Sequence, residues 1–210
     1  MASSSSHNGI PLAPLLEWYK IRDTFFGENF VSQNIPLAIE LALSCRHPDA
    51  RWLPEACAGN DANTEGDAKR VFSALGQNDA RALCFFWLCS TLGDRRDLTP
   101  LRRSAELGFA FTQALLAEKT QGDEKFKIAQ MAAAQGERDG FRWLGYCFRF
   151  GGGCEKNLDM AKKNLLCASE IGHVLAIYQV GRLFDESNSQ RWRWCGCAAA
   201  LGNSWSFLCN

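Results

Sequence analysis

Residues branched at the β carbon are scarce in this chain of 210 residues. It contains 4 valines, 7 isoleucines and 6 threonines, against 26 alanines and 24 leucines. Because β-strands are built largely from branched and aromatic side chains, this shortage argues against a large sheet. All six prolines lie at or before Pro100. Residues 101–210 therefore contain no proline, the residue that interrupts helices because it lacks a backbone N–H group. The composition predicts an all-α protein.

An excess of charge of either sign is also lacking. The 23 lysines and arginines balance the 23 aspartates and glutamates. Proteins that clamp nucleic acids, and anchors that bind membranes through basic patches, need a surplus of cations on one face. We therefore expect no nucleic-acid partner.

Long apolar runs and export signals are missing as well. No stretch approaches the roughly 18 uninterrupted apolar residues that a membrane-spanning helix needs. Residues 1–9 carry no basic segment, and the apolar core of a secretory signal does not follow them. The sequence thus predicts a soluble, cytoplasmic protein that does not insert into membranes, with a disordered tail at residues 1–14.

Ten cysteines are present, but no two have the C-x-x-C spacing of zinc and thioredoxin sites. Only His7, His47 and His173 could supply imidazole ligands. Most of the cysteines lie among Ala, Leu and Phe, where a thiol packs as a small apolar side chain. We expect buried thiols and no metal, with disulfides or a metal site as the alternative.

Motifs of known catalytic sites are absent too. The chain contains no G-x-S-x-G, S-x-x-K, H-E-x-x-H or G-x-x-x-x-G-K-S/T. The run Gly151-Gly152-Gly153 has the composition of a phosphate-binding loop, but no adjacent Lys-Ser or Lys-Thr follows it. We predict no catalytic residues, no cofactor and no small-molecule substrate.

What the chain does have is an internal repeat. A segment rich in small residues ends in glycine at intervals of 32, 28, 36 and 30 residues, and four residues later comes another small residue. These glycines are Gly76, Gly108, Gly136, Gly172 and Gly202, and the small residues are Ala80, Thr112, Gly140, Ala176 and Ser206. The spacing implies two helices per unit, because glycine ends a helix with left-handed backbone and a small residue lets the next helix approach its neighbour. A degenerate earlier unit has Arg46 and Ala50 at these positions.

The unit from Gly136 to Gly172 shows the pattern most fully. It keeps Leu144, Gly145, Gly151, Gly153, Ala161, Ala168 and Gly172 at the spacing of the Sel-one-like repeat (SLR), a relative of the tetratricopeptide repeat (TPR) that this unit resembles. It departs from that pattern in having Gly140 for Ala, Phe148 for Tyr, Cys154 for Val, Asn157 for Asp, Asn164 for Trp and Ser169 for Ala. The next unit keeps Val180-Gly181 and Trp194, but is six residues shorter.

This resemblance implies an α/α solenoid, a right-handed TPR-like superhelix of antiparallel helix pairs. We expect an N-terminal helical segment at 15–34 and repeats over 35–210, clearest at 136–172 and 172–202. The interior would be filled by Leu144, Phe148, Leu165, Val180 and Phe184. The chain ends on an apolar segment where a new helix should begin, so we expect a fragment of a protein that continues beyond Asn210.

The resemblance also indicates where a partner would bind. In TPR-like arrays the first helix of each unit lines a concave groove that holds an extended peptide or a helix. In this register the groove positions are Arg142, Tyr146 and Arg149, then Tyr178, Arg182 and Asp185, with Trp52 in the degenerate first unit. Tyrosine and arginine are common at binding hot spots. We expect a non-enzymatic scaffold or adaptor that binds a protein or peptide, preferably acidic or aromatic, and an ordinary solvated face is the alternative.

Three other readings stay open. A cysteine-rich bacterial branch of the family is associated with β-lactam binding and hydrolysis, but here Cys147 and Cys154 lie at a different place in the unit from that branch's cysteine pair. Residues 1–34 could form a separate docking or targeting segment. The alternation Arg191-Trp192-Arg193-Trp194 is typical of single-strand nucleic-acid binders. In the repeat register, however, Trp194 falls at a buried position and the two arginines at exposed ones.

Overall fold

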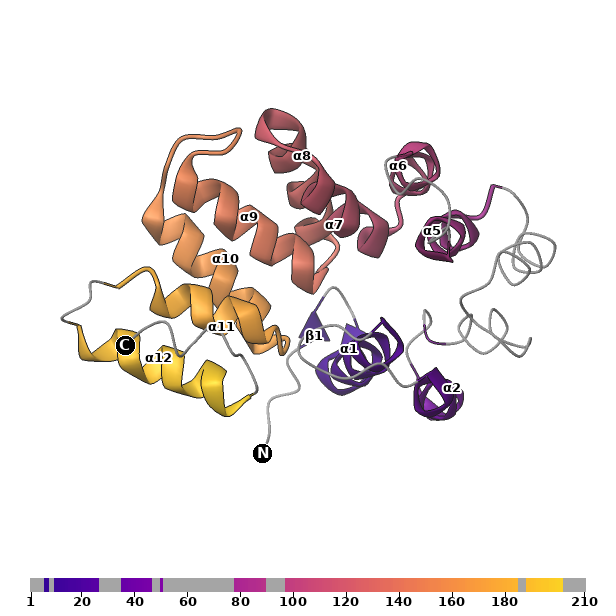
Figure 1. The fold of residues 1–210 in the computed structure, drawn as a ribbon, viewed down its shortest axis with the longest axis horizontal. Coiled ribbons are helices and arrows are strands. Elements are labelled where there is room, and N and C mark those ends of the chain that lie inside the picture. The colour runs from indigo at the N-terminus through magenta and orange to yellow at the C-terminus, as the bar shows by residue number, and fades with distance from the viewer. Residues whose placement is uncertain are drawn as a thin grey trace. The chain divides into compact units, whose positions relative to one another are not determined.

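The computed structural model describes residues 6–7, 10–26, 35–46, 50, 78–89, 97–184 and 188–201. Apart from one pair of two-residue strands, every regular element in these ranges is a helix (Figure 1). The predicted all-α fold is confirmed. The chain divides into two compact units, one of residues 1–28 and 32–116 and the other of residues 29–31 and 117–210.

The first unit is built from short helices packed in pairs. Its helices are α1 (Leu12–Phe26), α2 (Ile35–Ser44), α5 (Ala80–Cys89), α6 (Thr99–Glu106) and most of α7 (Ala110–Lys119). Helix α1 packs on α2, and α5 packs on α6. Buried polar side chains join α6 to α7, since Ser104 Oγ lies 2.8 Å from Thr112 Oγ1 and Gln113 Nε2 donates to the Ala105 carbonyl at 3.0 Å.

The N-terminal boundary differs from the predicted one. Helix α1 begins three residues earlier than expected. The preceding residues are not a wholly disordered tail, because β1 (Ser6–His7) and β2 (Ile10–Pro11) form an antiparallel pair. The two strands are separated in sequence by Asn8-Gly9, a dipeptide that favours tight hairpins. Trp18 and Tyr19 of α1 are buried.

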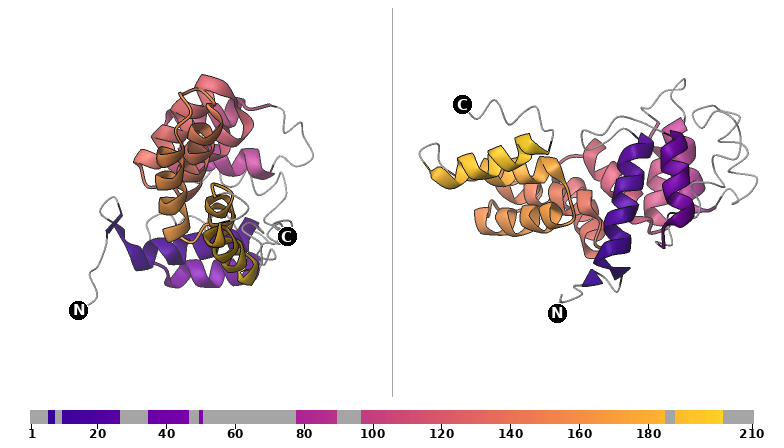
Figure 2. Two further views of the ribbon diagram at one scale, coloured as in Figure 1. Left: turned by 90° about the vertical axis from the view of Figure 1, so that its left-hand side faces the viewer. Right: turned by 90° about the horizontal axis from the view of Figure 1, so that it is seen from below.

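The second unit continues the pattern of helix pairs. It contains α8 (Gly122–Ala134), α9 (Arg138–Phe150), α10 (Leu158–Glu170), α11 (Val174–Gly181) and α12 (Ser189–Ala200). Each of these helices packs against the next one along the chain (Figures 1 and 2). The helix pairs expected at 136–172 and 172–202 are therefore α9 with α10 and α11 with α12. No helix in the described ranges is both long and apolar enough to cross a membrane.

The interior of the second unit consists of small residues and a few large ones. One buried cluster centres on Ala129, Ala133 and Leu144, with Phe148 packed against it, and another contains Leu165, Ala168, Ala176 and Val180, with Phe184 and Trp194 packed against it. All five residues predicted to fill the interior thus contribute to it. Because alanine recurs where helices touch, the alanine-rich composition reflects close packing as well as helix propensity.

Glycines act in this interior as the repeat predicts. Gly136 and Gly172 have φ of 82° and 84°, the left-handed conformation expected just after a helix. A β carbon at Gly145 would lie 2.8 Å from Leu165 Cγ, and one at Gly181 would lie 3.0 Å from Cys195 Sγ. Both glycines therefore let the two helices of a pair lie close together.

Candidate functional site

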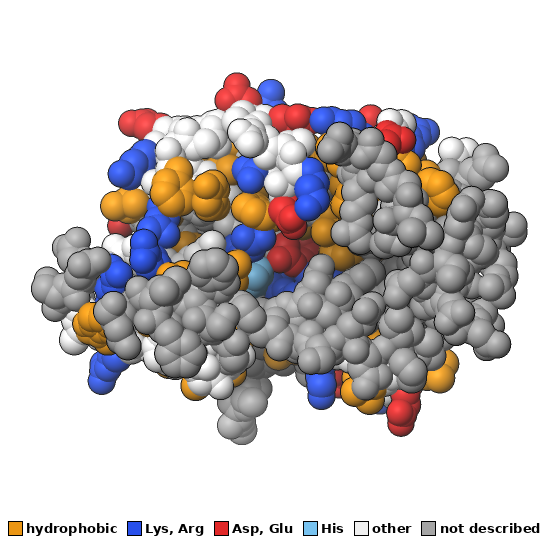
Figure 3. Space-filling model, viewed as in Figure 1, with side chains coloured by type: hydrophobic (Ala, Val, Ile, Leu, Met, Phe, Trp, Pro, Cys, Tyr) orange, Lys and Arg blue, Asp and Glu red, His pale blue; other side chains and the backbone are white. Residues whose placement is uncertain are grey.

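Three aromatic side chains form a row along α9. Trp143, Tyr146 and Phe150 are spaced three and four residues apart, which places them on one face of the helix. The ring centroids of Trp143 and Tyr146 are 5.9 Å apart, and those of Tyr146 and Phe150 are 4.6 Å apart. Tyr146 is 38% exposed and Phe150 is 58% exposed. Figure 3 shows hydrophobic side chains gathered over α9, with lysine and arginine side chains beside them.

Cations cover part of this aromatic row. Lys125 Nζ lies 4.0 Å from the centroid of the Trp143 ring, and Arg142 Cζ lies 3.7 Å from it. Arg149 Cζ lies 4.9 Å from the centroid of Phe150. These distances are within the range of cation–π attraction. Burial lowers the pKa of the Lys125 ammonium, and the nearby charge of Arg142 lowers it further.

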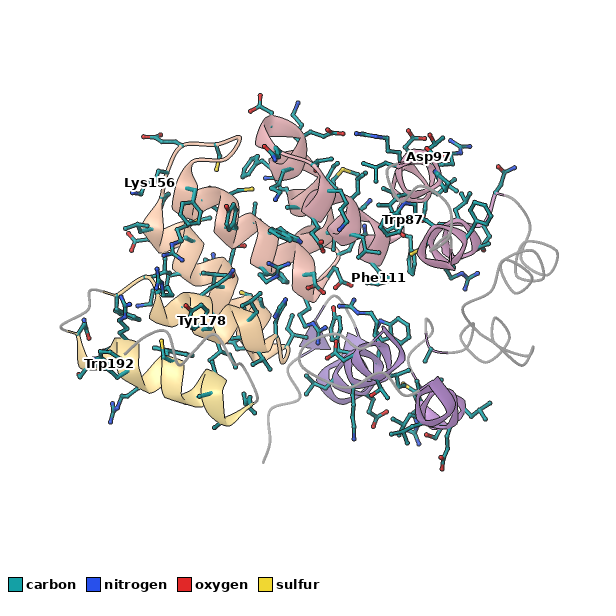
Figure 4. The ribbon with its side chains drawn as sticks, in the orientation of Figure 1. Trp87, Asp97, Phe111, Lys156, Tyr178 and Trp192 are labelled. Carbon is teal, nitrogen blue, oxygen red and sulfur yellow. The ribbon has the colours of Figure 1, made fainter. Side chains whose placement is uncertain are left out.

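Arg149 connects α9 to α11. Its Nη2 atom donates to the carbonyl oxygen of Arg182, the residue that directly follows α11, at 3.1 Å. Tyr146 and Tyr178 lie near enough to act on Arg149 electrostatically (Tyr178 is labelled in Figure 4). Burial lowers the pKa of the Arg149 guanidinium, and the positive charge of Arg182 adds to this effect. Four of the predicted groove residues are thus brought together.

A second link joins the beginnings of the same two helices. His173, the residue that directly precedes α11, has its Nε2 atom 2.9 Å from Oδ1 of Asp139 in the first turn of α9. Arg142 Nε lies 3.9 Å from the same carboxylate oxygen. Burial lowers the pKa of His173 to about 4, although Asp139 acts in the opposite direction. With Arg149 at the other end, this contact holds α9 and α11 side by side in the same direction.

We call the surface carried by these two helices the α9–α11 face. It consists of Trp143, Tyr146, Arg149, Phe150, Tyr178 and Arg182. Arg142, also predicted to face the groove, is only 8% exposed and packs on the Trp143 ring, so it is not part of this surface. Trp52 and Asp185, the remaining predicted positions, lie outside the described residues.

Sequence reasoning missed three residues of this region. Trp143 and Phe150 flank Tyr146 at three and four residues, so the aromatic spacing on a single helix could have revealed them. Lys125 comes from α8, and its contact with Trp143 depends on how α8 packs against α9. No spacing within one helix carries that information.

The Arg-Trp alternation near the C-terminus differs from its prediction. Arg191 is buried, and its Nη1 atom donates to the Phe184 carbonyl oxygen at 3.4 Å, whereas an exposed position was expected. This hydrogen bond directs the Arg191 side chain toward the chain just after α11 rather than into solvent. Arg193 is exposed as expected, and Trp194 packs against the core cluster.

Seven cysteines whose side chains the structure describes form no disulfide. Cys45, Cys84, Cys147 and Cys195 are buried, Cys154 and Cys167 are half-buried, and Cys197 is exposed. Burial raises the pKa of Cys147 to about 11, and burial also raises the pKa of Cys154. Within the described part of the chain, no three His, Cys, Asp or Glu side chains are placed to hold a metal ion.

These environments predict a large difference in thiol reactivity. We expect Cys197 to react with iodoacetamide at neutral pH at least about a hundredfold faster than Cys147, because alkylation needs an accessible thiolate. Mass spectrometry of peptides from the native protein, sampled over time, measures both rates. Equal rates, or a Cys147–Cys154 disulfide in a non-reducing digest, would contradict the structure.

Comparisons with known proteins indicate the fold. No protein-family model and no curated protein matches the sequence. Among solved structures, the protective antigen c5321 of uropathogenic Escherichia coli strains, which displays an SLR fold, matches with a TM-score of 0.64 and 19% identity over 93% of this chain. A Sel1 repeat protein from Oxalobacter formigenes matches with a TM-score of 0.59 and 18% identity over 92% of this chain. The chain spans only 48% and 63% of these two proteins. The likeness agrees with the repeats read from the sequence, and the chain therefore has the helical-repeat fold of SLR proteins.

Proposed function

We propose that this chain is a non-enzymatic interaction scaffold that binds a protein or peptide partner on the α9–α11 face. The observation that carries the proposal is the exposed pair of aromatic rings in contact, Tyr146 and Phe150, next to Arg149 and Arg182. Adjoining apolar groups rimmed by polar ones are typical of interaction sites. Large aromatic and arginine side chains also contribute most strongly to binding at such sites.

The repeat fold supports this proposal. Stacked helix pairs present the first helices of successive units as one extended surface, and here α9 and α11 are held together at both ends. The alternative of a cysteine-rich β-lactam hydrolase gains no support from Cys147 and Cys154, which are free thiols. The alternative of an ordinary solvated face does not account for the large exposed rings.

Charge reversal on this face tests the proposal. We expect Arg149→Glu combined with Arg182→Glu to reduce recovery of co-purifying partners by about tenfold or more, since a loss of about 1.4 kcal/mol already lowers affinity tenfold. Quantitative mass spectrometry after affinity purification of the intact protein measures recovery.

The matched control changes the same charge elsewhere. Lys127 on α8 and Lys163 on α10 are exposed and lie outside the α9–α11 face. Lys127→Glu combined with Lys163→Glu should leave recovery unchanged. Equal recovery of every partner by the two double variants would rule out the proposed face.

A further inference from the structure

The α9–α11 face carries cations that no carboxylate of the described residues neutralises. Neither Arg149 nor Arg182 forms an ion pair with any residue that the structure describes. Asp139, in the first turn of α9, is already engaged by His173 at 2.9 Å and by Arg142 at 3.9 Å. Within the described part of the chain, no carboxylate competes with an external anion for these two guanidinium groups.

The positive charges of these two arginines repel each other. Arg182 lies close enough to Arg149 to lower its pKa, in addition to the effect of burial. An anion placed between two guanidinium groups removes this repulsion and accepts hydrogen bonds from both. A carboxylate suits this position, because its two oxygens match the forked N–H groups of arginine.

An apolar surface begins directly beside this anion position. Arg149 is the neighbour of Phe150 in sequence, and its guanidinium lies over the Phe150 ring. Phe150 in turn contacts Tyr146, and both rings are exposed. A ligand whose acidic group lies between the arginines thus places its adjoining residue on these two rings.

A peptide suits the face better than a nucleic acid does. Single-strand binders stack bases on open aromatic rings. Here Lys125 and Arg142 lie over the Trp143 ring, so this ring is not open to a base. The chain as a whole has no net positive charge to attract a phosphate backbone.

We infer that the α9–α11 face recognises a peptide segment in which aspartate or glutamate adjoins a large aromatic or aliphatic residue, with the carboxylate between Arg149 and Arg182 and the apolar side chain on Tyr146 and Phe150. This inference rests on the proposed function and specifies the partner's chemistry. Binding of this kind weakens as salt is added, because exposed charges are screened.

Selection from a random library of twelve-residue peptides on phage tests the inference with the full chain as bait. We expect recovered peptides to share an acidic residue next to Trp, Phe or Leu. Fluorescence anisotropy of a labelled synthetic representative should show affinity at least about tenfold weaker for Arg149→Glu with Arg182→Glu, and unchanged affinity for Lys127→Glu with Lys163→Glu. Replacing the acidic residue of the peptide with its amide should weaken binding to the unmodified chain similarly.

Several results would overturn the inference. The first is a selection that enriches no acidic peptides. The second is a representative peptide whose affinity is the same for the Arg149→Glu, Arg182→Glu variant as for the original chain. The third is a labelled oligouridine of twelve nucleotides that binds more tightly than the best peptide. If partner recovery still depends on the α9–α11 face while the selected peptides are not acidic, only this inference fails. If partner recovery does not depend on the face, the proposed function fails as well.

Discussion

Gly140→Ala is expected to lower the free energy of unfolding by about 2 kcal/mol, the usual effect of inserting a group into a packed contact. A β carbon at position 140 would lie 2.6 Å from Ala132 Cβ and 2.6 Å from the backbone nitrogen of Ala133. Neither atom can rotate away, since one is a β carbon and the other belongs to the backbone of α8. The added methyl group must therefore push α9 away from α8. Urea unfolding followed by circular dichroism measures the loss.

Gly196→Ala provides the matched control for this substitution. Gly196 lies within α12, and a β carbon there would have no neighbouring atom within 4 Å. Since alanine favours helix over glycine by up to about 1 kcal/mol, this variant should be as stable as the original chain or more so. A stable Gly140→Ala protein, or an equal loss from both substitutions, would contradict the close approach of α8 and α9.

Position 140 also shows how far the repeat pattern can be used. The SLR pattern has alanine here, and the sequence alone shows only that a small residue has been replaced by a smaller one. The structure supplies the reason, because the β carbon of Ala132 on α8 occupies the space that a methyl group would need. Glycine in place of the pattern's alanine thus indicates that α8 and α9 approach each other more closely than an alanine at position 140 would allow.

Features of the fold that depend on nearby residues could be predicted from the sequence. The glycines that end helices, the small residues four positions later and the apolar interior all follow from spacing within one repeat. Burial of polar side chains could not be predicted in this way. Arg142 and Arg191 both lie at positions where a helix alone would leave them exposed, yet both are buried by neighbouring groups. The same holds for Lys125, whose partner Trp143 lies on another helix.

The second large expected effect is a loss of stability in acid that comes from His173. The ordinary pKa of histidine is 6.5, whereas burial lowers the pKa of His173 in the folded protein to about 4. Between these two values the unfolded chain binds a proton at this residue and the folded chain does not. The contribution of His173 to stability is therefore fully present above pH 6.5 and is lost progressively as the pH falls toward 4, by roughly 3 kcal/mol in total.

The groups around His173 determine the direction of this effect. Asp139 favours the protonated ring through its charge and its hydrogen bond, while Arg138 and Arg142 disfavour it. Burial outweighs the attraction of Asp139. The neutral ring can donate a hydrogen bond from Nε2 to Asp139, so the link between α9 and α11 needs no charge on the histidine.

His173→Gln isolates this contribution, because the glutamine amide can also donate to Asp139 but does not titrate. Other carboxylates make both proteins less stable in acid, so the informative quantity is the difference between their free energies of unfolding. We expect that difference to change by roughly 3 kcal/mol between pH 7 and pH 4, with the original chain losing more stability. Parallel curves for the two proteins, or an NMR titration of the His173 ring with a midpoint near 6.5, would show that the ring is not buried as described. In that case the Asp139–His173 contact would no longer explain how the beginnings of α9 and α11 are held together, and Arg149 would be the remaining link between them.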